Sequence, residues 1–317
     1  MLLPSGPSIR LALSIARSAR SKSFADERRL IATDILHPLS TDSCCSHRHI
    51  VNDRLRYELR GFAYWAECAN PFRRTVTARH LPLGLQIDGY KRDAVGRGLY
   101  RRGIHETDLT RFVLGNYTAG DSFLDIGANI GYFSCLFGKI AGARGRVVAI
   151  EPEPQNNALL RENIRQNQLE NVTVHACAIG AHDGTAQLGI YKGANRGRHS
   201  LIDTASYRTT IEVPVRRLDD VVRDAAVNSW ALLKMDVEGF EPFVLQGAAD
   251  TLSQTRSLVL EYAADDWRKA GAEPSALFKQ LAPHFAHILR FDRGAVVETT
   301  AAECLRSDIK AELVFLR

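Results

Sequence analysis

FLDIGANIGYF, residues 123–133, is the stretch that decides the fold of this chain. An apolar run typical of a buried strand contains Asp125 near its end and passes into a turn framed by Gly127 and Gly131. Glycine permits a sharp turn and the close approach of a ligand to the backbone, and the free N–H groups of a following helix suit a carboxylate or phosphate. A carboxylate at a buried strand end costs free energy unless something binds there. The stretch therefore indicates a ligand-binding strand–turn–helix.

Strand-like and helix-like segments alternate from about residue 84 to the C-terminus. We expect strands over residues 122–127, 146–152, 172–179, 185–191, 210–216, 230–238, 257–263, 287–292 and 311–317, with the fourth and fifth forming an extra hairpin. Helices are expected near residues 133–141, 160–168, 244–252 and 276–285. This alternation predicts an α/β fold with a mostly parallel, doubly wound sheet. Ligands bind such sheets at the edge where the strand C-termini meet.

Two kinds of ligand compete for the glycine turn. A dinucleotide-binding loop would read G-x-G-x-x-G, whereas this turn reads GANIG (127–131) and lacks the middle glycine. Asp125 would also repel a diphosphate. A ligand with an ammonium and a carboxylate fits better, because Asp125 accepts from the ammonium and the turn amides receive the carboxylate. The methionine part of S-adenosylmethionine carries both groups.

Two further strand ends are candidates for contact with a nucleoside. Glu151 ends the second strand, twenty positions after Gly131. A carboxylate there can accept from both ribose hydroxyls, and it would serve NAD equally well. Backbone groups near Ala178, at the end of the third strand, are placed to face an adenine.

The segment KMDVEG, residues 234–239, puts three charges into an apolar strand. Alternation along a strand places Lys234, Asp236 and Glu238 on one side until the strand ends. Such charges are expensive unless they are paired or belong to a site. Glu261 ends the next strand similarly, so neighbouring strands are expected to bring several carboxylates to one cleft. A structural ion pair between Lys234 and Asp236 is the alternative.

The ordered set of these segments resembles the FkbM family of S-adenosylmethionine-dependent methyltransferases. The matching segments are DAVGRGLYRRGIHETDL (93–109), FLDIGANIGYFS (123–134), VVAIEPEPQNNALLRENI (147–164), VPVRRLDDVV (213–222), LLKMDVEGFEPFVLQGA (232–248) and VLEY (259–262). The resemblance covers roughly residues 84–262. It implies a class I methyltransferase fold, Rossmann-like, with a seven-stranded, mostly parallel sheet and one antiparallel strand near the C-terminus. It also implies methyl transfer to a hydroxyl oxygen of a small molecule, sugar or glycan.

The resemblance further implies roles for individual residues. Those expected to contact the cofactor are Glu106, Asp125, Gly127, Asn129, Gly131, Glu151 and Ala178. Asp236 and Glu238 are expected beside the transferred methyl, where a carboxylate would act as general base for in-line displacement. Glu261 and His105 are weaker candidates for this role. Glu106 matches the acid of the family's G-x-Y-E element, and His105 stands where that element usually has tyrosine.

A metal and a lid are open alternatives around the same cleft. Asp236, Glu238 and Glu261 could hold Mg²⁺, but no full set of oxygen ligands is specified and we predict no metal. The loop at residues 193–200 carries Arg196, Arg198 and His199, as either a lid over the acceptor or a solvated hairpin tip. The cysteines and histidines at residues 44–49 do not match zinc-site spacing.

Residues 1–83 are predicted to be a partly helical N-terminal extension of unknown role, and residues 84–317 to be the methyltransferase domain. In the extension, Leu55, Leu59 and Phe62 fall at i, i+4 and i+7, which predicts a helix with an apolar stripe. The first 25 residues are basic and serine-rich, like a transit peptide or a disordered start. No apolar run approaches ~20 residues, so we expect no membrane span. Cys135 and Cys177 lie in apolar runs and are expected to be free thiols, which suggests a reducing compartment and a cytoplasmic location.

Two other function classes remain open. One is a nicotinamide-dependent oxidoreductase on a similar Rossmann-like sheet. The other is a non-catalytic RNA-binding module that uses the basic N-terminal segment. The net charge of +5 is spread along the chain and no aromatic–basic stacking motif is evident, so we predict a small-molecule or glycan acceptor and no nucleic-acid partner. The sequence does not predict an oligomeric state.

Overall fold

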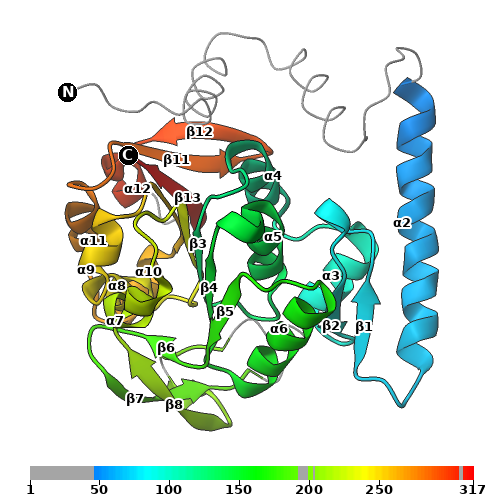
Figure 1. Ribbon diagram of the computed structural model, residues 1–317, viewed down its shortest axis with the longest axis horizontal. Coiled ribbons are helices and arrows are strands. Elements are labelled where there is room, and N and C mark those ends of the chain that lie inside the picture. Colours follow the sequence, from blue (N-terminus) through cyan, green and yellow to red (C-terminus); the bar gives the residue numbers. More distant parts are fainter. Residues whose placement is uncertain (1–45, 192–198, 203, 307–309) are drawn as a thin grey trace.

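An eight-stranded sheet forms the centre of the molecule (Figure 1). The computed structural model describes residues 46–191, 199–202, 204–306 and 310–317, with side chains from residue 55 onward. The strand order is β12-β11-β13-β10-β9-β3-β4-β5. The parallel strands are β3 (Phe123–Ile126), β4 (Val147–Ile150), β5 (Val172–His175), β9 (Leu232–Met235) and β10 (Ser257–Tyr262). This order confirms the predicted α/β sheet and places the turn after β3 next to the end of β9.

The C-terminal strands depart from the expected seven-stranded pattern by one strand. β13 (Ala311–Leu316) is inserted antiparallel between β10 and β11 (His287–Asp292), as the predicted antiparallel strand. β12 (Ala295–Thr299) then pairs antiparallel with β11 at the sheet edge, across a turn at Arg293 and Gly294 that has positive φ at both residues. The short, partly exposed β12 lacks the apolar run that marked the other strands, so the sequence did not predict it.

Helices cover both faces of the sheet, and neighbouring strand residues belong to opposite cores. Phe123 packs with the cluster under α4 (Thr107–Asn116), α5 (Tyr132–Ala141) and α6 (Pro154–Gln166). Leu124 packs with the cluster on the other face. The helices of that second face are α7 (Leu218–Val222), α8 (Glu241–Gln246), α9 (Ala249–Ser253), α10 (Ala264–Lys269), α11 (Pro274–Leu281) and α12 (Ala301–Arg306). Burial on both faces explains why the strands are continuous apolar runs.

Two predicted elements are each divided in the structure. The single strand expected over residues 172–179 is β5 and then β6 (Ala178–Ile179), which belongs to a second sheet. That three-stranded sheet has the order β6-β8-β7 and contains the predicted hairpin of β7 (Gly184–Gly189) and β8 (Thr210–Arg216). The single helix expected over residues 244–252 is α8 and α9. The chain leaves β5 before Ala178, so the backbone predicted to face an adenine lies at the start of the small sheet.

The N-terminal part consists of α2 (Ser46–Ala69), β1 (Thr75–Ala78), β2 (Ile87–Tyr90) and α3 (Ala94–Arg102). β1 and β2 pair antiparallel, so the predicted boundary after residue 83 falls between two paired strands. Asn163 on α6 ties this part to the sheet domain: its side chain accepts from Asp88 N at 2.8 Å and donates to Ile130 O at 2.7 Å. The predicted helix around Leu55 is present as α2.

The cysteines and the helices bear on two further expectations. Cys135, Cys177 and Cys304 are free and buried, as predicted for the first two, and Cys68 is free and half-buried. Cys44 and Cys45 lie outside the described residues. Among the helices that the structure describes, none has the length and apolar character needed to cross a bilayer.

Candidate functional site

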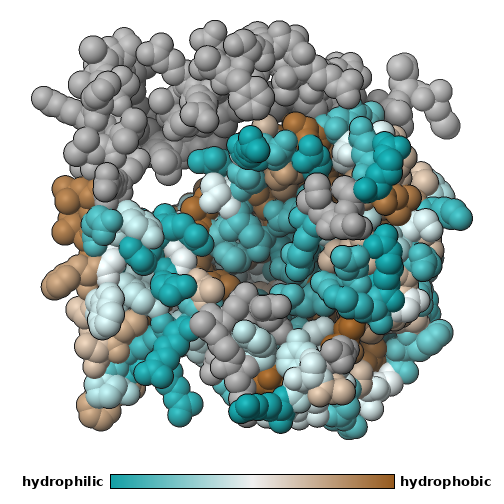
Figure 2. Space-filling model, turned by 180° about the vertical axis from the view of Figure 1, so that it is seen from behind, coloured by the Kyte–Doolittle hydropathy of each residue, from teal (hydrophilic) through white to brown (hydrophobic). Residues whose placement is uncertain are grey.

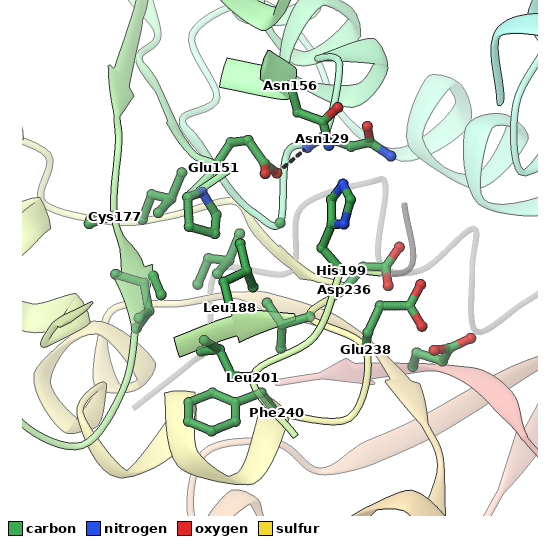
Figure 3. A pocket seen from close by; sticks show the side chains of 18 of the residues that line it. Asn129, Glu151, Asn156, Cys177, Leu188, His199, Leu201, Asp236, Glu238 and Phe240 are labelled. Carbon is green, nitrogen blue, oxygen red and sulfur yellow. Dashed lines mark hydrogen bonds between the residues drawn. The ribbon is translucent and has the colours of Figure 1, made fainter. Parts of the chain in front are cut away.

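A cavity of about 240 Å³ opens at the C-terminal ends of β3, β4, β9 and β10 (Figure 3). Glu151 and Asn129 lie on one side, Asp236 and Glu238 on the other, and the ring of His199 lies between them. The predicted residues that line the cavity are Glu106, Gly127, Asn129, Glu151, Ala178, Asp236 and Glu238, with the weaker candidates His105 and Glu261. The fold thus brings residues from six distant segments to one hollow.

The floor of the cavity is the turn that follows β3. Ile150 O accepts from the backbone N–H groups of Gly127 and Ala128, each at 3.0 Å. Gly127 has φ +78°, and a Cβ there would lie 1.9 Å from the backbone oxygen of Asp236. Gly131 has φ +88° and packs so closely on α6 that a Cβ would lie 2.4 Å from Leu160 Cδ1. The two glycines therefore set the separation of the turn from β9 and from α6.

The carboxylate of Glu151 is held at one end of the cavity by backbone donors. Its Oε2 accepts from Asn129 N at 2.8 Å, and its Oε1 accepts from Glu153 N at 2.9 Å. Burial raises the pKa of Glu151 to about 7, although both backbone N–H groups favour the charged form. Each oxygen keeps a lone pair for a further donor. Asn156, which the sequence did not predict, adds a buried Oδ1 with no hydrogen-bond partner in the described part of the chain.

Lys234 forms the charged centre at the other end. It is 4% exposed, and its Nζ lies 3.5 Å from Asp236 Oδ2 and 5.0 Å from the centre of the Phe133 ring. Burial alone would lower the pKa of Lys234, but the carboxylates of Asp236, Glu106 and Asp125 raise it above its usual range. The ion pair that was the alternative for Lys234 and Asp236 is therefore present, and Asp236 also lines the cavity.

Asp125 lies behind the cavity wall and is 1% exposed. Its Oδ2 accepts from Ser134 Oγ at 2.5 Å, and its Oδ1 has no hydrogen-bond partner among the described residues. Burial raises the pKa of Asp125, which the Lys234 ammonium opposes. Neither Asp125 nor Gly131 is among the lining residues, so their contact with the cofactor stays a prediction.

Glu106 presents one oxygen to a histidine and leaves the other unpaired. His105 Nε2 lies 3.1 Å from Glu106 Oε1, while Oε2 is buried with no partner in the described part of the molecule. Burial opposes ionisation, but the Lys234 ammonium and His105 hold the pKa of Glu106 at about 2. Glu312 on β13, which the sequence did not predict, is its neighbour, and burial together with the charge of Glu106 raises the pKa of Glu312 to about 8. Glu106 is thus a fixed negative group at this end.

The loop after β9 carries the remaining candidates. β9 ends at Met235, so Asp236 and Glu238 lie in a loop and the predicted strand through residue 238 is wrong. Glu241 supports this loop: its Oε1 accepts from Val237 N at 3.1 Å, and its Oε2 accepts from Trp267 Nε1 at 2.8 Å. Burial raises the pKa of Glu241 to about 7.

Backbone strain is concentrated around the cavity. Of the seven described non-glycine residues with positive φ, three line it: Glu106 at +41°, Asn129 at +50° and Glu238 at +53°. Non-glycine residues keep a positive φ where the surrounding structure holds them in that conformation, commonly at functional sites. The strain therefore marks the same place as the buried charges.

The remaining alternatives have mixed outcomes. Glu261 is bridged to Lys310, with Lys310 Nζ 2.8 Å from Glu261 Oε2. Within the described ranges, no three His, Cys, Asp or Glu side chains are grouped so as to hold a metal ion. Arg196 and Arg198 lie outside the described residues, whereas His199 lines the cavity and accepts at Nδ1 from Tyr191 N at 3.0 Å.

Replacing Lys234 with methionine tests the charged centre. We expect the free energy of unfolding at pH 7 to fall by about 3 kcal/mol, because buried carboxylates lose their counter-ion. The pKa of Glu106 is lowered to about 2 in the folded protein. Ionised Glu106 therefore stabilises the folded protein fully above the pKa that this residue has in the unfolded chain, and the stabilisation is lost as the pH falls through about 2. The difference in free energy of unfolding between the unaltered protein and the variant should thus shrink at acidic pH. Urea denaturation at pH 7 and pH 3.5 measures this.

Lys279→Met is the matched control, because Lys279 is an exposed lysine on α11. It should change the free energy of unfolding by less than about 0.5 kcal/mol. Equal stability of the two variants would mean that Lys234 has no role in holding the carboxylates.

Comparison with known proteins gives a consistent result. Residues 125–298 match the family described as the methyltransferase FkbM domain. The chain is 28% identical over 185 residues to the 2-O-methyltransferase NoeI of Sinorhizobium fredii, covering 54% of this chain and 74% of that protein. It is 30% identical over 159 residues to the 31-O-demethyl-FK506 methyltransferase FkbM of Streptomyces tacrolimicus, covering 41% of this chain and 60% of that protein. It is 26% identical over 178 residues to the hexuronic acid methyltransferase AglP of Haloferax volcanii, covering 56% of this chain and 67% of that protein.

Proposed function

The chain belongs to the FkbM family of S-adenosylmethionine-dependent methyltransferases, and we propose that it methylates a hydroxyl oxygen of a sugar or another small hydroxylated acceptor. The observation that carries the proposal is one cavity with Glu151 at one end and Asp236 and Glu238 at the other. Two of the similar proteins are named for transfer to oxygen and one for a hexuronic acid. The matched region spans 60–74% of the length of these proteins, so the acceptor class belongs to the proposal.

The lining residues fit the cofactor at both ends. Glu151 and Asn156 would accept from the ribose hydroxyls, since both residues line the cavity, the Glu151 oxygens each keep a lone pair, and Asn156 Oδ1 has no hydrogen-bond partner among the described residues. Glu106 Oε2, buried and without a partner in the described part of the chain, would accept from the ammonium. The open backbone at Gly127 would let the methionine part lie against the turn. When bound, S-adenosylmethionine supplies a methyl group that is already activated on a sulfonium.

Glu238 and Asp236 would divide the work on the acceptor. Lys234 pairs with Asp236 and orients it, so Asp236 would act as a fixed hydrogen-bond acceptor for the hydroxyl. Glu238, two residues further along the loop, would take the proton of the acceptor hydroxyl. Positioning the hydroxyl contributes several kcal/mol in such reactions, and a general base about 10²–10⁴-fold in rate. The role of Glu238 rests on its place in the cavity and its strained backbone.

The pKa of Glu151 predicts that cofactor affinity depends on pH. Burial raises this pKa to about 7, and the carboxylate is the form that accepts from two hydroxyls. The apparent affinity for S-adenosylmethionine should therefore rise by up to about tenfold from pH 6 to pH 8, as the competent form becomes populated. Because the pKa is raised, the free protein should lose stability over the same rise in pH. Calorimetric titration at both pH values measures the effect, and Glu151→Gln should bind weakly with no pH dependence.

The proposal is tested by a transfer assay on a panel of acceptors. The protein is incubated with methyl-labelled S-adenosylmethionine and with neutral sugars, uronic acids and hydroxylated small molecules, and products are identified by mass spectrometry. Label on an acceptor oxygen supports the proposal. Label on nitrogen would contradict the acceptor class, and binding of NAD in place of S-adenosylmethionine would favour the oxidoreductase alternative.

A further inference from the structure

The apolar stripe of α2 points away from the molecule. Four large apolar side chains lie at i, i+4, i+7 and i+10 on one face of the helix. Their exposed fractions are 54% for Leu55, 61% for Leu59, 79% for Phe62 and 77% for Trp65. α2 stands at the side of the domain (Figure 1), and apolar colours follow its outer edge in the space-filling view (Figure 2). An amphipathic helix normally turns this face to the core.

The opposite face of α2 is the one that packs on the domain. Tyr64 is 8% exposed, and its ring meets that of Tyr100 on α3 edge-on at 5.5 Å. The Arg101 guanidinium lies 4.2 Å from the centre of the Tyr57 ring. Tyr64 also donates a hydrogen bond to the backbone oxygen of Lys91. The orientation of α2 is therefore fixed by aromatic and polar contacts, and these hold the stripe outward.

Positive charge is concentrated beside the stripe, so the expectation that it is spread along the chain is wrong. Residues 55–103 contain ten Lys and Arg against four Asp and Glu, a formal net charge of +6, whereas the whole chain carries +5. A cavity of about 720 Å³ lies between α2 and the segment that runs into α3. Its lining includes four basic residues, one acid and two aromatic residues of the stripe: Lys91, Arg92, Arg97, Arg101, Glu58, Phe62 and Trp65. Two aromatic residues of the stripe thus border a basic hollow.

The turn after α2 also combines an exposed aromatic side chain with exposed basic side chains. Phe72 is 94% exposed, and Arg73 and Arg74 follow it as exposed residues. Apolar and aromatic side chains next to arginine and lysine are the composition of helices that lie in the interface of an anionic bilayer. The apolar side chains enter the acyl boundary while the basic groups contact the phosphates.

We propose that the stripe of α2, together with the basic cavity beside it, binds the surface of a bilayer that contains anionic phospholipids. Single-stranded nucleic acid fits less well, because Leu55 and Leu59 have no flat ring on which a base could stack. A second copy of the chain fits less well, because two surfaces of high positive charge would face each other. Anionic lipid complements both the apolar stripe and the charge.

Trp65 makes the proposal directly measurable in the full-length protein. The chain has three tryptophans, and the other two, Trp230 and Trp267, are 1% and 0% exposed. A change in fluorescence on adding vesicles would therefore report on Trp65. With vesicles of phosphatidylcholine and phosphatidylglycerol at 7:3, we expect a blue shift and protection from acrylamide, roughly tenfold stronger partitioning than with phosphatidylcholine alone, and weakening by salt.

Two variants separate the apolar and the charged contributions while retaining Trp65. Leu59→Ser/Phe62→Ser should weaken partitioning by about 100-fold, since two large apolar side chains no longer enter the bilayer. Arg92→Gln/Arg97→Gln should remove most of the preference for anionic vesicles. Arg144→Gln/Lys279→Gln, which removes two exposed charges from other parts of the chain, is the matched control and should behave like the unaltered protein. Thermal melting confirms that each variant is folded.

Four results would overturn the proposal. The first is no shift of Trp65 with anionic vesicles. The second is undiminished vesicle binding by the folded Leu59→Ser/Phe62→Ser variant. The third is that light scattering shows a dimer that this variant dissociates. The fourth is that a single-stranded oligonucleotide binds the stripe while vesicles do not.

Discussion

Gly127→Ala should abolish measurable binding of S-adenosylmethionine and lower the free energy of unfolding by more than about 4 kcal/mol. The new Cβ would lie 1.9 Å from the backbone oxygen of Asp236, and the backbone at φ +78° already disfavours a side chain. The neighbouring carbonyl cannot simply retreat, because Asp236 N donates to Ile126 O at 3.0 Å. The end of β9 would have to separate from β3, which deforms the cavity floor. Urea denaturation and calorimetric titration measure the two effects.

Gly120→Ala separates backbone strain from the steric clash. Gly120 has φ +98°, and a Cβ there would meet no atom within 4 Å. This variant should lose only about 1–2 kcal/mol and bind the cofactor normally. If both alanine variants behaved alike, the close contact between the turn and Asp236 would have no importance for the site.

Glu238→Gln should lower kcat by about 10²–10⁴-fold, with little change in cofactor affinity. Glutamine keeps the size of the side chain and hydrogen-bonding capacity but cannot take a proton. Asp236→Asn should have a smaller effect on kcat and a larger effect on the acceptor KM, because Lys234 already pairs with Asp236. Single-turnover transfer to an acceptor found in the panel assay isolates the chemical step from product release.

Glu261→Gln is the control for a general loss of negative charge in the cavity. Glu261 lines the same cavity but is bridged to Lys310. The Glu261→Gln substitution should lower kcat by less than about tenfold. A larger loss of kcat in Asp236→Asn than in Glu238→Gln would exchange the two roles. Full activity in both variants would exclude Asp236 and Glu238 as the base.

The parts of the fold that follow from local pattern were predictable from the sequence. The apolar strands with their glycine turn, and the alternation with helices, are visible in short windows because burial on both faces demands apolar runs. The ends of elements were less predictable. The strand through Glu238 stops at Met235 because Glu241 and Trp267 hold the next residues in a loop, a contact between segments 26 residues apart.

The site was predictable where its residues follow strand ends, as for Glu151 and Asp236. Asn156 and Glu312 were not assigned to it, because each joins the site only through the packing of other elements. The burial of Asp125 was not predicted: it is 1% exposed, and its Oδ2 accepts from Ser134 on α5. The helix of α2 was evident from periodicity, but which face it buries depends on α3.

The contact between Gly127 and the carbonyl of Asp236 has a consequence for how such enzymes diversify. Main-chain atoms set the distance there between the turn after β3 and the loop after β9. Other side chains that line the cavity, such as Phe240 and Leu201, can therefore be exchanged without altering that spacing. A chain built this way can acquire a new substrate while its reaction geometry is inherited unchanged.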